Sequence, residues 1–386
     1  MPFLIKNNHM VYKVPFVNYP LQYHHLEKEI DAAIKDVLKR GDLILRNDVE
    51  EFEKNIASFL GVEYAVGVNS CTDAMILSLK AAGIGQGDEV ITVSHTFFAT
   101  IEVIRHCGAT PILIDVREDF LMDMEKVESA ITSKTKAILP VHLNGRCCEM
   151  DKLMEIAKKH NLIVIEDAAQ ALGAEFNGKK AGSFGIAGCF SFYPAKLLGA
   201  AGDGGIVATN SQDLAEKVRL LRNHGQKTKT EIICYGFTSR LHNLQAAILN
   251  VKFKYVPEWI KRRREIAKIY NGGLSNIPEV ELPPAPNSDE RYFDIYQNYV
   301  LKAQKRDELF NFLEEKGVET LIKDPIPNHW HKGLGLSHFQ LPYTEKLAKE
   351  VISLPMYPEL TEEQINYVIN CVKEFYSKKI EKLFSY

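Results

Sequence analysis

Short apolar runs alternate with segments of helical periodicity along the first two thirds of the chain. The runs are rich in β-branched residues and are expected to form buried strands at residues 65–68, 89–93, 111–114, 137–141, 162–165 and 188–192. Between them apolar residues recur every three or four positions, as in 151–160, which predicts helices. Such alternation is typical of a mainly parallel sheet flanked by helices, so the sequence predicts an α/β fold.

The two ends of the chain depart from that pattern. From Leu26 to Leu38 apolar residues keep a helical spacing, and the following Gly41 is typical of a helix end. Beyond residue 270 come a glycine pair, a proline-rich stretch, a strand-like run and a helix-like run, at residues 271–273, 282–286, 296–301 and 307–316. We therefore expect a large α/β domain over residues 1–270 and a smaller α+β domain over 271–386. Residues 1–25 could pack on the smaller domain.

Composition and charge argue against several classes of protein. The 386 residues carry a formal net charge of −3 with both signs well mixed, which gives no basic surface for nucleic acid. The seven cysteines have no zinc-type spacing, and the adjacent Cys147 and Cys148 suit neither a metal site nor a disulfide framework. No signal-peptide pattern opens the chain, and no apolar run approaches the roughly 20 residues needed to cross a bilayer. We therefore expect a soluble cytoplasmic protein without metal, nucleic-acid or membrane partners.

Basic residues cluster most clearly in the run Lys261-Arg262-Arg263-Arg264, which lies in a helical stretch. A run of this kind usually forms a solvated helix face, and we expect that here. Its functional alternative is a patch that binds a diphosphate.

A lysine follows the last predicted strand in the sequence Ser191-Phe192-Tyr193-Pro194-Ala195-Lys196, and the loop beyond it ends in Gly202-Asp203-Gly204-Gly205. An amine is nucleophilic only in its neutral form, which burial or a nearby positive charge favours by lowering the pKa. Lys196 is therefore a candidate for a lysine that forms a Schiff base. Taken alone, a lysine at such a position is more often simply solvated.

A carboxylate, Asp167, follows the apolar run 162–165 within Glu166-Asp167-Ala168-Ala169-Gln170. The carboxyl ends of parallel strands are where open α/β sheets bind ligands. A lysine and a carboxylate at such ends match the needs of pyridoxal phosphate, whose ring withdraws electrons when its nitrogen is protonated. The alternative role for Asp167 is a helix N-cap.

Two further segments could contact such a cofactor. The strand 65–68 leads into Ser70-Cys71-Thr72 at the start of a helical pattern, where free backbone N–H groups and the Thr72 hydroxyl could hold a phosphate, with Ser191 adding a hydroxyl. An ordinary capping sequence is the alternative. Phe97, after the strand 89–93, could stack on a planar ring, although a phenylalanine there is more often core.

Together these segments resemble the DegT/DnrJ/EryC1/StrS family of nucleotide-sugar aminotransferases. The similarity rests on residues 69–74, 95–100, 140–146, 166–170, 191–205, 222–225, 239–241, 245–247 and 353–360. These segments follow one another in order over nearly the whole chain. The resemblance implies a fold type I aminotransferase that depends on pyridoxal phosphate and forms a homodimer with each active site at the subunit interface.

The resemblance also implies roles for individual residues. Lys196 corresponds to the lysine that carries the cofactor and moves the proton, and Asp167 to the partner of the pyridinium nitrogen. Gln170 resembles the residue beside the ring hydroxyl, and Phe97 the one that stacks on the ring. The remaining residues would form a phosphate cradle and a contact near the sugar, namely Cys71, Thr72 and Ser191 for the phosphate and His329 for the sugar.

Three positions depart from the usual family pattern. Thr238 stands in place of an asparagine that reaches the cofactor phosphate of the neighbouring subunit, and threonine is shorter. Cys71 replaces a glycine of the phosphate turn, which is compatible only with a backbone that does not need a positive φ. Arg46 also replaces a usual glycine and could alter substrate contacts nearby.

The implied reaction is a ping-pong transamination in which glutamate donates the amino group and a nucleotide-linked keto sugar receives it. The product would be an amino sugar for a glycoside or for a surface polysaccharide such as lipopolysaccharide. Tyr193, as a substrate contact, and the loop 198–205 resemble enzymes that act on 3-keto sugars, which favours a 3-keto-6-deoxyhexose. Enzymes for 4-keto sugars often have histidine at the position of Tyr193, and a 4-keto substrate is the alternative.

Other interpretations stay open from the sequence. Another fold type I enzyme, such as a desulfurase or an aldolase, would share Lys196 and Asp167 but not residues 353–360. A dehydratase relative would have histidine in place of Lys196. From a different class, a regulatory protein could bind pyridoxal phosphate without turnover, although no helix-turn-helix segment precedes the core.

Overall fold

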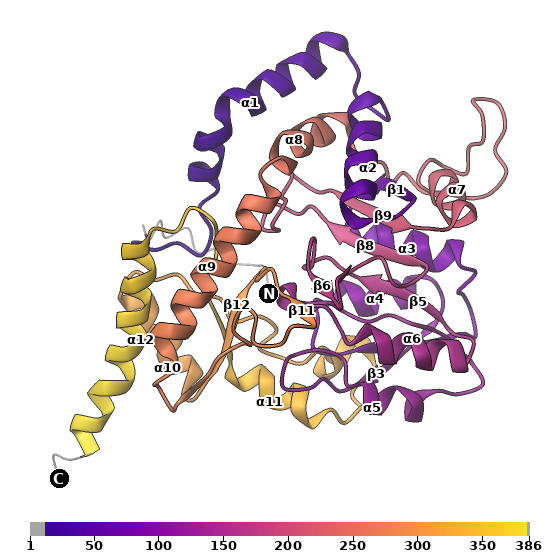
Figure 1. Cartoon of the computed structure of the whole chain (residues 1–386). Helices are drawn as coiled ribbons and strands as arrows, with labels where there is room; N and C mark the ends of the chain where they lie inside the picture. The colour runs from indigo at the N-terminus through magenta and orange to yellow at the C-terminus, as the bar shows by residue number, and fades with distance from the viewer. Residues whose placement is uncertain (1–11, 384–386) are drawn as a thin grey trace.

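A seven-stranded sheet lies at the centre of the computed structural model, which describes residues 12–383 without the side chains of 378–383 (Figure 1). The strand order is β1-β9-β8-β5-β4-β2-β3. The bounds are β1 (Tyr64–Val68), β2 (Glu89–Val93), β3 (Thr110–Ile114), β4 (Thr135–Ile138), β5 (Ile163–Asp167), β8 (Ala187–Ser191) and β9 (Gly205–Thr209). Strand β9 is antiparallel to both of its neighbours, and the other neighbouring pairs are parallel. The predicted mainly parallel α/β sheet is therefore confirmed.

The antiparallel strand β9 is the one strand of this sheet that the sequence pattern missed. We expected Gly205 to end a loop, whereas β9 begins at this residue and is buried along its whole length. Glycine is needed there because a Cβ on Gly205 would lie 2.3 Å from the carbonyl carbon of Ser70. This close approach sets β9 directly against the turn that follows β1.

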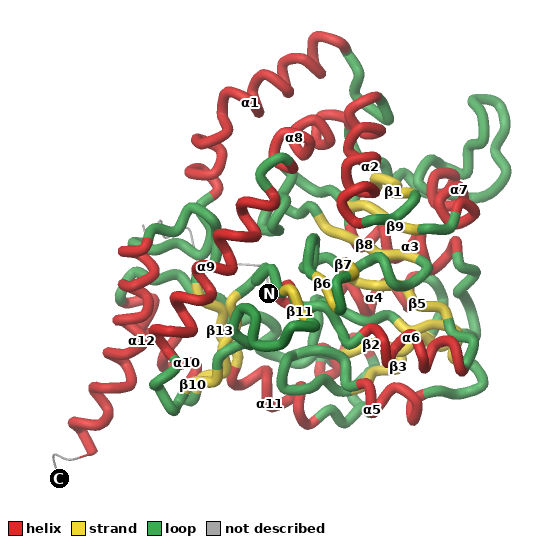
Figure 2. Tube along the Cα trace, in the orientation of Figure 1, coloured by secondary structure: helices red, strands yellow, loops and turns green. Residues whose placement is uncertain are grey.

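Helices cover both faces of the sheet, as the tube in Figure 2 shows. One face carries α3 (Cys71–Ala81), α4 (Ala99–His106) and α7 (Gln212–Leu221), and the other carries α2 (Asn47–Leu60), α6 (Met150–Lys159) and α8 (Asn243–Phe253). Successive residues of one strand serve opposite faces, since Ala65 packs in the core beside α2 and Val66 in the core beside α3. Burial on both sides explains why these strands are continuously apolar.

The helix predicted near the start of the chain is α1 (Tyr19–Arg40), which packs on α8 (Figure 1). It ends at Gly41, whose φ of 70° lies in the left-handed region that a helix stop of this kind requires. At its other end the Asn18 side chain accepts a hydrogen bond from the Leu21 N–H at 3.1 Å. The predicted glycine stop is confirmed.

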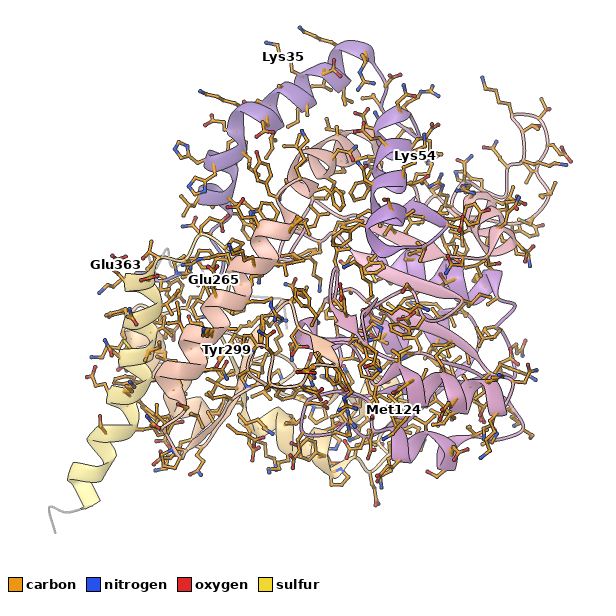
Figure 3. The ribbon with its side chains drawn as sticks, viewed as in Figure 1. Lys35, Lys54, Met124, Glu265, Tyr299 and Glu363 are labelled. Carbon is orange, nitrogen blue, oxygen red and sulfur yellow. The ribbon has the colours of Figure 1, made fainter. Side chains whose placement is uncertain are left out.

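The C-terminal third has a core of its own. An antiparallel sheet of β10 (Val280–Glu281), β12 (Tyr299–Ala303) and β13 (Val351–Leu354) is accompanied by α10 (Arg306–Glu315), α11 (Pro342–Glu350) and α12 (Glu362–Leu383). Tyr299 lies inside this part, its ring centroid 4.9 Å from that of Tyr270, whereas Glu363 of α12 faces outward (Figure 3). Val14 joins the same core and pairs with Val318, while residues 1–11 lie outside the described residues.

Helix α9 (Val256–Leu274) connects the two cores. Its first half, with Trp259, packs in the sheet core, and its second half, with Tyr270, packs in the C-terminal core. A small sheet of β11 (Tyr292–Phe293), β6 (Glu175–Phe176) and β7 (Lys179–Lys180) makes a second connection. The helix continues across residue 270, and a domain division at that residue stays a prediction.

The basic run at 261–264 is not simply a solvated face, which corrects the interpretation from the sequence. Arg263 is 4% exposed, and its Nη1 donates to the carbonyl oxygens of Tyr296, Gln297 and Met356 at 3.1, 3.2 and 2.9 Å. Burial lowers the pKa of Arg263 to about 10. Arg263 points toward the junction of the two cores because it lies on the inner side of α9, and the three carbonyls accept from its Nη1 there, whereas its Nε has no hydrogen-bond partner among the described residues.

Replacing Arg263 with methionine is expected to lower the free energy of unfolding by about 3 kcal/mol, because three buried carbonyl groups lose their donor. Chemical denaturation followed by circular dichroism measures the change. Lys261→Met, at an exposed position of the same helix, is the matched control and should change stability by less than about 0.5 kcal/mol. Equal stability of the two variants would contradict this account of Arg263.

Candidate active site

Lys196 lies in the loop that leaves the carboxyl end of β8. Its backbone N–H donates to the Tyr193 carbonyl at 2.8 Å, which closes a tight turn and directs the side chain inward. Burial lowers the pKa of the Lys196 amine, while the charges of Asp167 and Cys71 act in the opposite direction. The environment therefore makes the neutral, nucleophilic form of the amine easier to reach than in a solvated lysine.

Asp167 ends β5, the parallel neighbour of β8, and is 5% exposed. Its Oδ2 accepts from the Thr100 hydroxyl at 2.7 Å, and its Oδ1 accepts from the Ala169 N–H at 3.1 Å. Thr100 is in turn hydrogen-bonded to the Thr96 hydroxyl at 2.8 Å. No helix begins within residues 168–174, so the alternative of a helix cap does not hold. The carboxylate is fixed in orientation at the carboxyl edge of the sheet.

The turn after β1 leads into α3, and its residues lie beside this pair. Ser70 caps the helix by accepting from the Asp73 N–H at 3.1 Å, and the N–H groups of Cys71 and Thr72 have no acceptor among the described residues. Burial raises the pKa of the Cys71 thiol well above its usual value, with Asp167 adding to the effect and Lys196 opposing it. These interactions place Cys71 within electrostatic range of both groups.

The backbone of Cys71 resolves one question raised by the sequence. Cys71 is the first residue of α3 and has a negative φ, so a glycine is not needed at this turn. Arg46 likewise has an extended backbone, with a φ of −122°, as the cap of α2. Neither departure from the family pattern strains the chain.

Gln170 and Ser191 flank the same edge of the sheet. Gln170 Oε1 accepts from the Asn144 N–H at 3.0 Å and from Asn298 Nδ2 at 2.9 Å. Ser191 Oγ accepts from the Tyr193 N–H at 3.2 Å. Both side chains are therefore oriented by neighbours, and the ring and phosphate contacts expected of them stay predictions.

Three of the predicted contact residues are exposed. Phe97 is 67% exposed, which leaves its ring free for a planar ligand, and Tyr193 is 54% exposed. Thr238 is exposed as well, and its hydroxyl is hydrogen-bonded to His224 Nε2 at 2.8 Å. Among the described residues, no hydrogen bond or ion pair joins Phe97 or Thr238 directly to Lys196, Asp167 or Cys71.

His329 is fully buried, which the sequence did not indicate. Its Nδ1 is hydrogen-bonded to the Ser94 hydroxyl at 2.8 Å, and its Nε2 lies 3.3 Å from Glu345 Oε1. The adjacent Asn328 donates from Nδ2 to the carbonyl oxygens of Ser94 and Thr96. In this arrangement His329 holds the loop that carries Phe97, and a contact of His329 with a sugar stays a prediction.

Lys323 is a charged residue near the site that sequence reasoning missed. It lies between Leu321, which pairs with Ser353 of β13, and Asn328, which holds the loop after β2. Burial and the charge of Lys196 lower the pKa of Lys323 to about 7. The segment has no periodicity that marks it as buried, so only the folded chain reveals that the two lysines are neighbours.

The residues present fit pyridoxal phosphate by the chemistry of their donor set. A lysine whose ammonium is disfavoured, an oriented carboxylate and free N–H groups at the start of α3 correspond to the aldehyde, the ring nitrogen and the phosphate. The three lie together at the carboxyl edge of β1, β5 and β8. Lys196, Asp167, Cys71 and Thr72 are the residues that would hold the cofactor.

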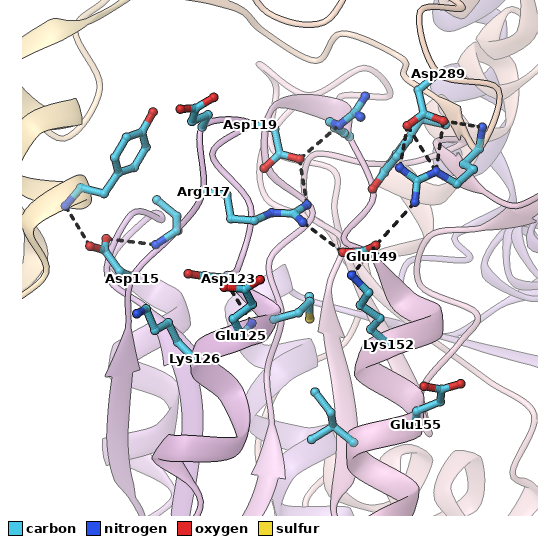
Figure 4. A pocket seen from close by; sticks show the side chains of 18 residues that line it. Asp115, Arg117, Asp119, Asp123, Glu125, Lys126, Glu149, Lys152, Glu155 and Asp289 are labelled. Atoms are coloured by element: carbon cyan, nitrogen blue, oxygen red, sulfur yellow. Dashed lines mark hydrogen bonds and ion pairs between the residues drawn. The ribbon is translucent and has the colours of Figure 1, made fainter.

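A hollow of about 1070 Å³ lies elsewhere, beside α5 (Met124–Val127) and α6, and none of the predicted site residues lines it (Figure 4). Its charged side chains pair with one another, as Arg117 does with Glu149 at 3.0 Å and Arg291 with Asp289 at 2.8 Å. Carboxylates outnumber basic side chains in its lining, and Glu118, Glu125 and Glu155 take part in none of these ion pairs, so the hollow is acidic overall. Size alone does not identify it as the reaction site.

Within residues 12–383, the helices are too short or too polar to cross a membrane. In the same part of the chain, no group of three histidine, cysteine, aspartate or glutamate side chains could hold a metal ion.

Comparison with known proteins gives an independent view of the same residues. The DegT/DnrJ/EryC1/StrS aminotransferase family model matches residues 24–373. A pleiotropic regulatory protein of Geobacillus stearothermophilus is 43% identical over 367 residues, covering 94% of this chain and 98% of its own. A dTDP-3-amino-3,4,6-trideoxy-alpha-D-glucose transaminase of Streptomyces venezuelae is 40% identical over 368 residues, covering 94% of this chain and 96% of its own.

Similarity in structure agrees with similarity in sequence. The crystal structure of S. venezuelae DesV in complex with a ketimine intermediate superposes with a TM-score of 0.91 at 40% identity, covering 94% of this chain and 98% of that one. The fold and the sequence thus match over nearly the same length. This chain belongs to the DegT/DnrJ/EryC1/StrS aminotransferase family and is a pyridoxal-phosphate-dependent aminotransferase.

Proposed function

We propose that this protein transfers an amino group from glutamate to a 3-keto-6-deoxyhexose carried on a nucleotide. The observation that supports the reaction is the cluster of Lys196, Asp167 and the start of α3, in which burial lowers the pKa of the lysine. The donor is inferred from family resemblance, and the acceptor sugar from that resemblance and from relatives named as transaminases of 3-amino sugars carried on dTDP.

Different residues of this chain would move the proton and bind the cofactor. Bound pyridoxal phosphate supplies an electron-withdrawing ring that makes the carbon next to the transferred nitrogen acidic. Lys196 would act as the base and then the acid that moves a proton, a role that requires its amine to be neutral when it accepts the proton. Asp167 keeps the ring nitrogen protonated, and the N–H groups of Cys71 and Thr72 bind the phosphate.

We infer that Gln170, Phe97, Ser191 and Tyr193 complete the ligand contacts. Gln170 is held beside the turn after β5, close to Asp167 in the chain, and is assigned to the ring hydroxyl. Phe97 would stack on the ring through its free face, Ser191 would add a hydroxyl to the phosphate cradle, and Tyr193 would contact the sugar. His329 would reach the sugar only if its present partners released it.

We further propose a homodimer with the active site at its interface. Large apolar side chains lie exposed on the single chain at Phe97, Tyr193, Ile232, Ile233 and Tyr235. Exposed apolar groups of this kind are typical of a surface that a second copy covers. In that arrangement Thr238 of one subunit would face the cofactor phosphate of the other.

The product would be an amino sugar for a glycoside or a surface polysaccharide such as lipopolysaccharide, made in the cytoplasm. A relative named as a regulatory protein supports one alternative, a protein that binds the cofactor without turnover. Lys196 argues against that alternative, because a protein that only binds the cofactor needs no lysine to move a proton, and loss of this lysine would have favoured binding without turnover.

Lys196→Ala is expected to lower the formation of 2-oxoglutarate from glutamate by at least about a thousandfold, since the group assigned to move the proton is removed. The fold should be kept, and Lys35→Ala, at an exposed position of α1, should leave the rate unchanged. A Lys196→Ala variant that turns over like the unaltered protein would overturn the assignment. Cofactor binding without 2-oxoglutarate from the unaltered protein would support the regulatory alternative.

The acceptor is tested with a panel of nucleotide-linked keto sugars offered to the protein after it has reacted with glutamate. We expect the 3-keto-6-deoxyhexose to be aminated at least about tenfold faster than its 4-keto isomer, a difference of about 1.4 kcal/mol in transition-state stabilisation. The position of the new amine is read by nuclear magnetic resonance of the product. Preference for the 4-keto isomer would contradict the proposed acceptor without affecting the role of Lys196.

Lys196→Met is expected to raise the pKa of Lys323 above about 7, because the neighbouring positive charge that lowers it is removed. The titration of reductively ¹³C-methylated lysines, followed by nuclear magnetic resonance of the protein without cofactor, measures this pKa. Lys35→Met is the control and should leave it unchanged. If the Lys323 pKa is the same in both variants, the two lysines do not interact.

A further inference from the structure

A single side chain from outside the loop that carries Lys196 makes two hydrogen bonds to the backbone of that loop. Gln297 Oε1 accepts from the Leu197 N–H at 2.7 Å, and Gln297 Nε2 donates to the Ala195 carbonyl at 2.8 Å. The two hydrogen bonds engage the residues immediately before and after Lys196. One carboxamide therefore fixes the backbone on both sides of the lysine.

The Gln297 side chain is itself held in place by the C-terminal core. Gln297 is 6% exposed, and Arg263 of α9 donates to the carbonyl oxygens of Gln297 and of the preceding Tyr296. Tyr296 has a φ of 51°, a left-handed conformation that a bulky residue adopts only where its surroundings enforce it. The tyrosine hydroxyl donates to the Pro284 carbonyl at 2.8 Å, which adds to that enforcement.

The next residue reaches a second loop of the site. Asn298 Nδ2 donates to Gln170 Oε1 at 2.9 Å and to Asn144 Oδ1 at 3.2 Å. Gln170 belongs to the turn that follows Asp167. Residues 297 and 298 thus join the lysine loop after β8 to the turn after β5.

We propose that Gln297 is a positioning residue that sets where Lys196 stands relative to Asp167, and that it does so through paired hydrogen bonds to the backbone of the lysine loop. The Gln297 carboxamide is hydrogen-bonded to the backbone of residues 195 and 197 and not to the Lys196 amine, so we assign it no part in the chemistry itself. The catalytic consequence rests on the proposed function, whereas the clamp rests on the geometry of the chain alone.

The chemistry of the side chain explains why glutamine suits this position. A carboxamide ends in one acceptor and one donor, which match an N–H and a C=O that lie two residues apart. Glutamate would keep the acceptor for Leu197 but set a carboxylate oxygen against the Ala195 carbonyl. Methionine would keep the length of the side chain and remove both hydrogen bonds, leaving two buried backbone groups unsatisfied.

The far end of the loop is held independently. Gln245 of α8 accepts from the Ala201 N–H at 2.8 Å and donates to the Ala201 carbonyl at 3.3 Å, and Lys252 donates to the Gly199 carbonyl. Loss of the Gln297 clamp therefore loosens the stretch around Lys196 and not the whole loop. The contacts at the two ends of the loop can therefore be tested separately.

The experiment compares Gln297→Met and Gln297→Glu with Gln304→Met, the same substitution at an exposed glutamine of the C-terminal third. Amide hydrogen exchange of the protein without cofactor is read at Leu197, with Ala201 as an internal reference. The rate at which Lys196 captures pyridoxal phosphate is read from the visible absorption of the covalent complex. The first measurement needs no cofactor, and the second reports the reactivity of the lysine before any turnover.

Gln297→Met is expected to speed Leu197 exchange about tenfold and to slow capture of the cofactor about tenfold, with Ala201 unchanged, because both bonds to the loop are lost. Gln297→Glu should keep Leu197 protected, since its acceptor remains, and should still slow capture. Gln304→Met should match the unaltered protein in both measurements. If Gln297→Met does not fold, as judged by circular dichroism, Gln297→Glu alone tests the proposal. The expected result is then slow exchange at Leu197 together with slower capture of the cofactor by Lys196.

Unchanged Leu197 exchange in Gln297→Met, or unchanged capture in either variant, would overturn the proposal. Faster exchange at both Leu197 and Ala201 would also overturn it, because the effect would then be a general loosening of the loop. If the unaltered protein captures no cofactor at Lys196, the proposed function fails. In that case hydrogen exchange at Leu197 still tests whether Gln297 holds the backbone of the lysine loop.

Discussion

Keeping a charged amine away from water is costly, and the arrangement around Lys196 depends on that cost. Burial disfavours the ammonium form, while the charges of Asp167 and Cys71 favour it. The balance lowers the pKa of the lysine while the Asp167 carboxylate stays beside it as a counter-charge. A lysine in this condition loses its proton more readily than a solvated one and still lies beside a carboxylate.

The fold meets this condition by bringing together chain segments that are far apart in sequence. Parallel pairing sets the end of β5 beside β8, so that Asp167 lies opposite Cys189, a few residues before the lysine loop. Strand β9 closes against the turn at Ser70, an approach that only Gly205 permits. The C-terminal core then reaches back through Arg263 and Gln297 to hold the loop from outside. The lysine is thus positioned by both cores of the molecule.

Much of this framework could be predicted from the sequence, because it follows from local patterns. Apolar runs predicted the parallel strands, Gly41 predicted the end of α1, and the positions of Lys196, Asp167 and Cys71 after strands predicted that they meet. Their close association follows from the rule that parallel strands end at one edge of a sheet.

What the sequence did not reveal depends on contacts between distant segments. Arg263 looked solvated because its neighbours in the chain are basic, yet three carbonyls from other segments surround it. The fully buried position of His329 depends on Ser94 and Glu345, and no periodicity marks either contact. Lys323 and Gln297 lie beside the lysine loop only in the folded chain, so the sequence did not predict their proximity to it. Polar groups that act through such long-range contacts carry no local signal.

The most direct test of the central claim is to locate the residue that binds the cofactor. The protein would be mixed with pyridoxal phosphate, reduced with borohydride and digested, and the peptides would be weighed by mass spectrometry before and after treatment with glutamate. The account predicts a cofactor adduct on Lys196 that is absent when glutamate is added before reduction. An adduct on Lys323 or on exposed lysines only, or one that glutamate does not remove, would contradict it.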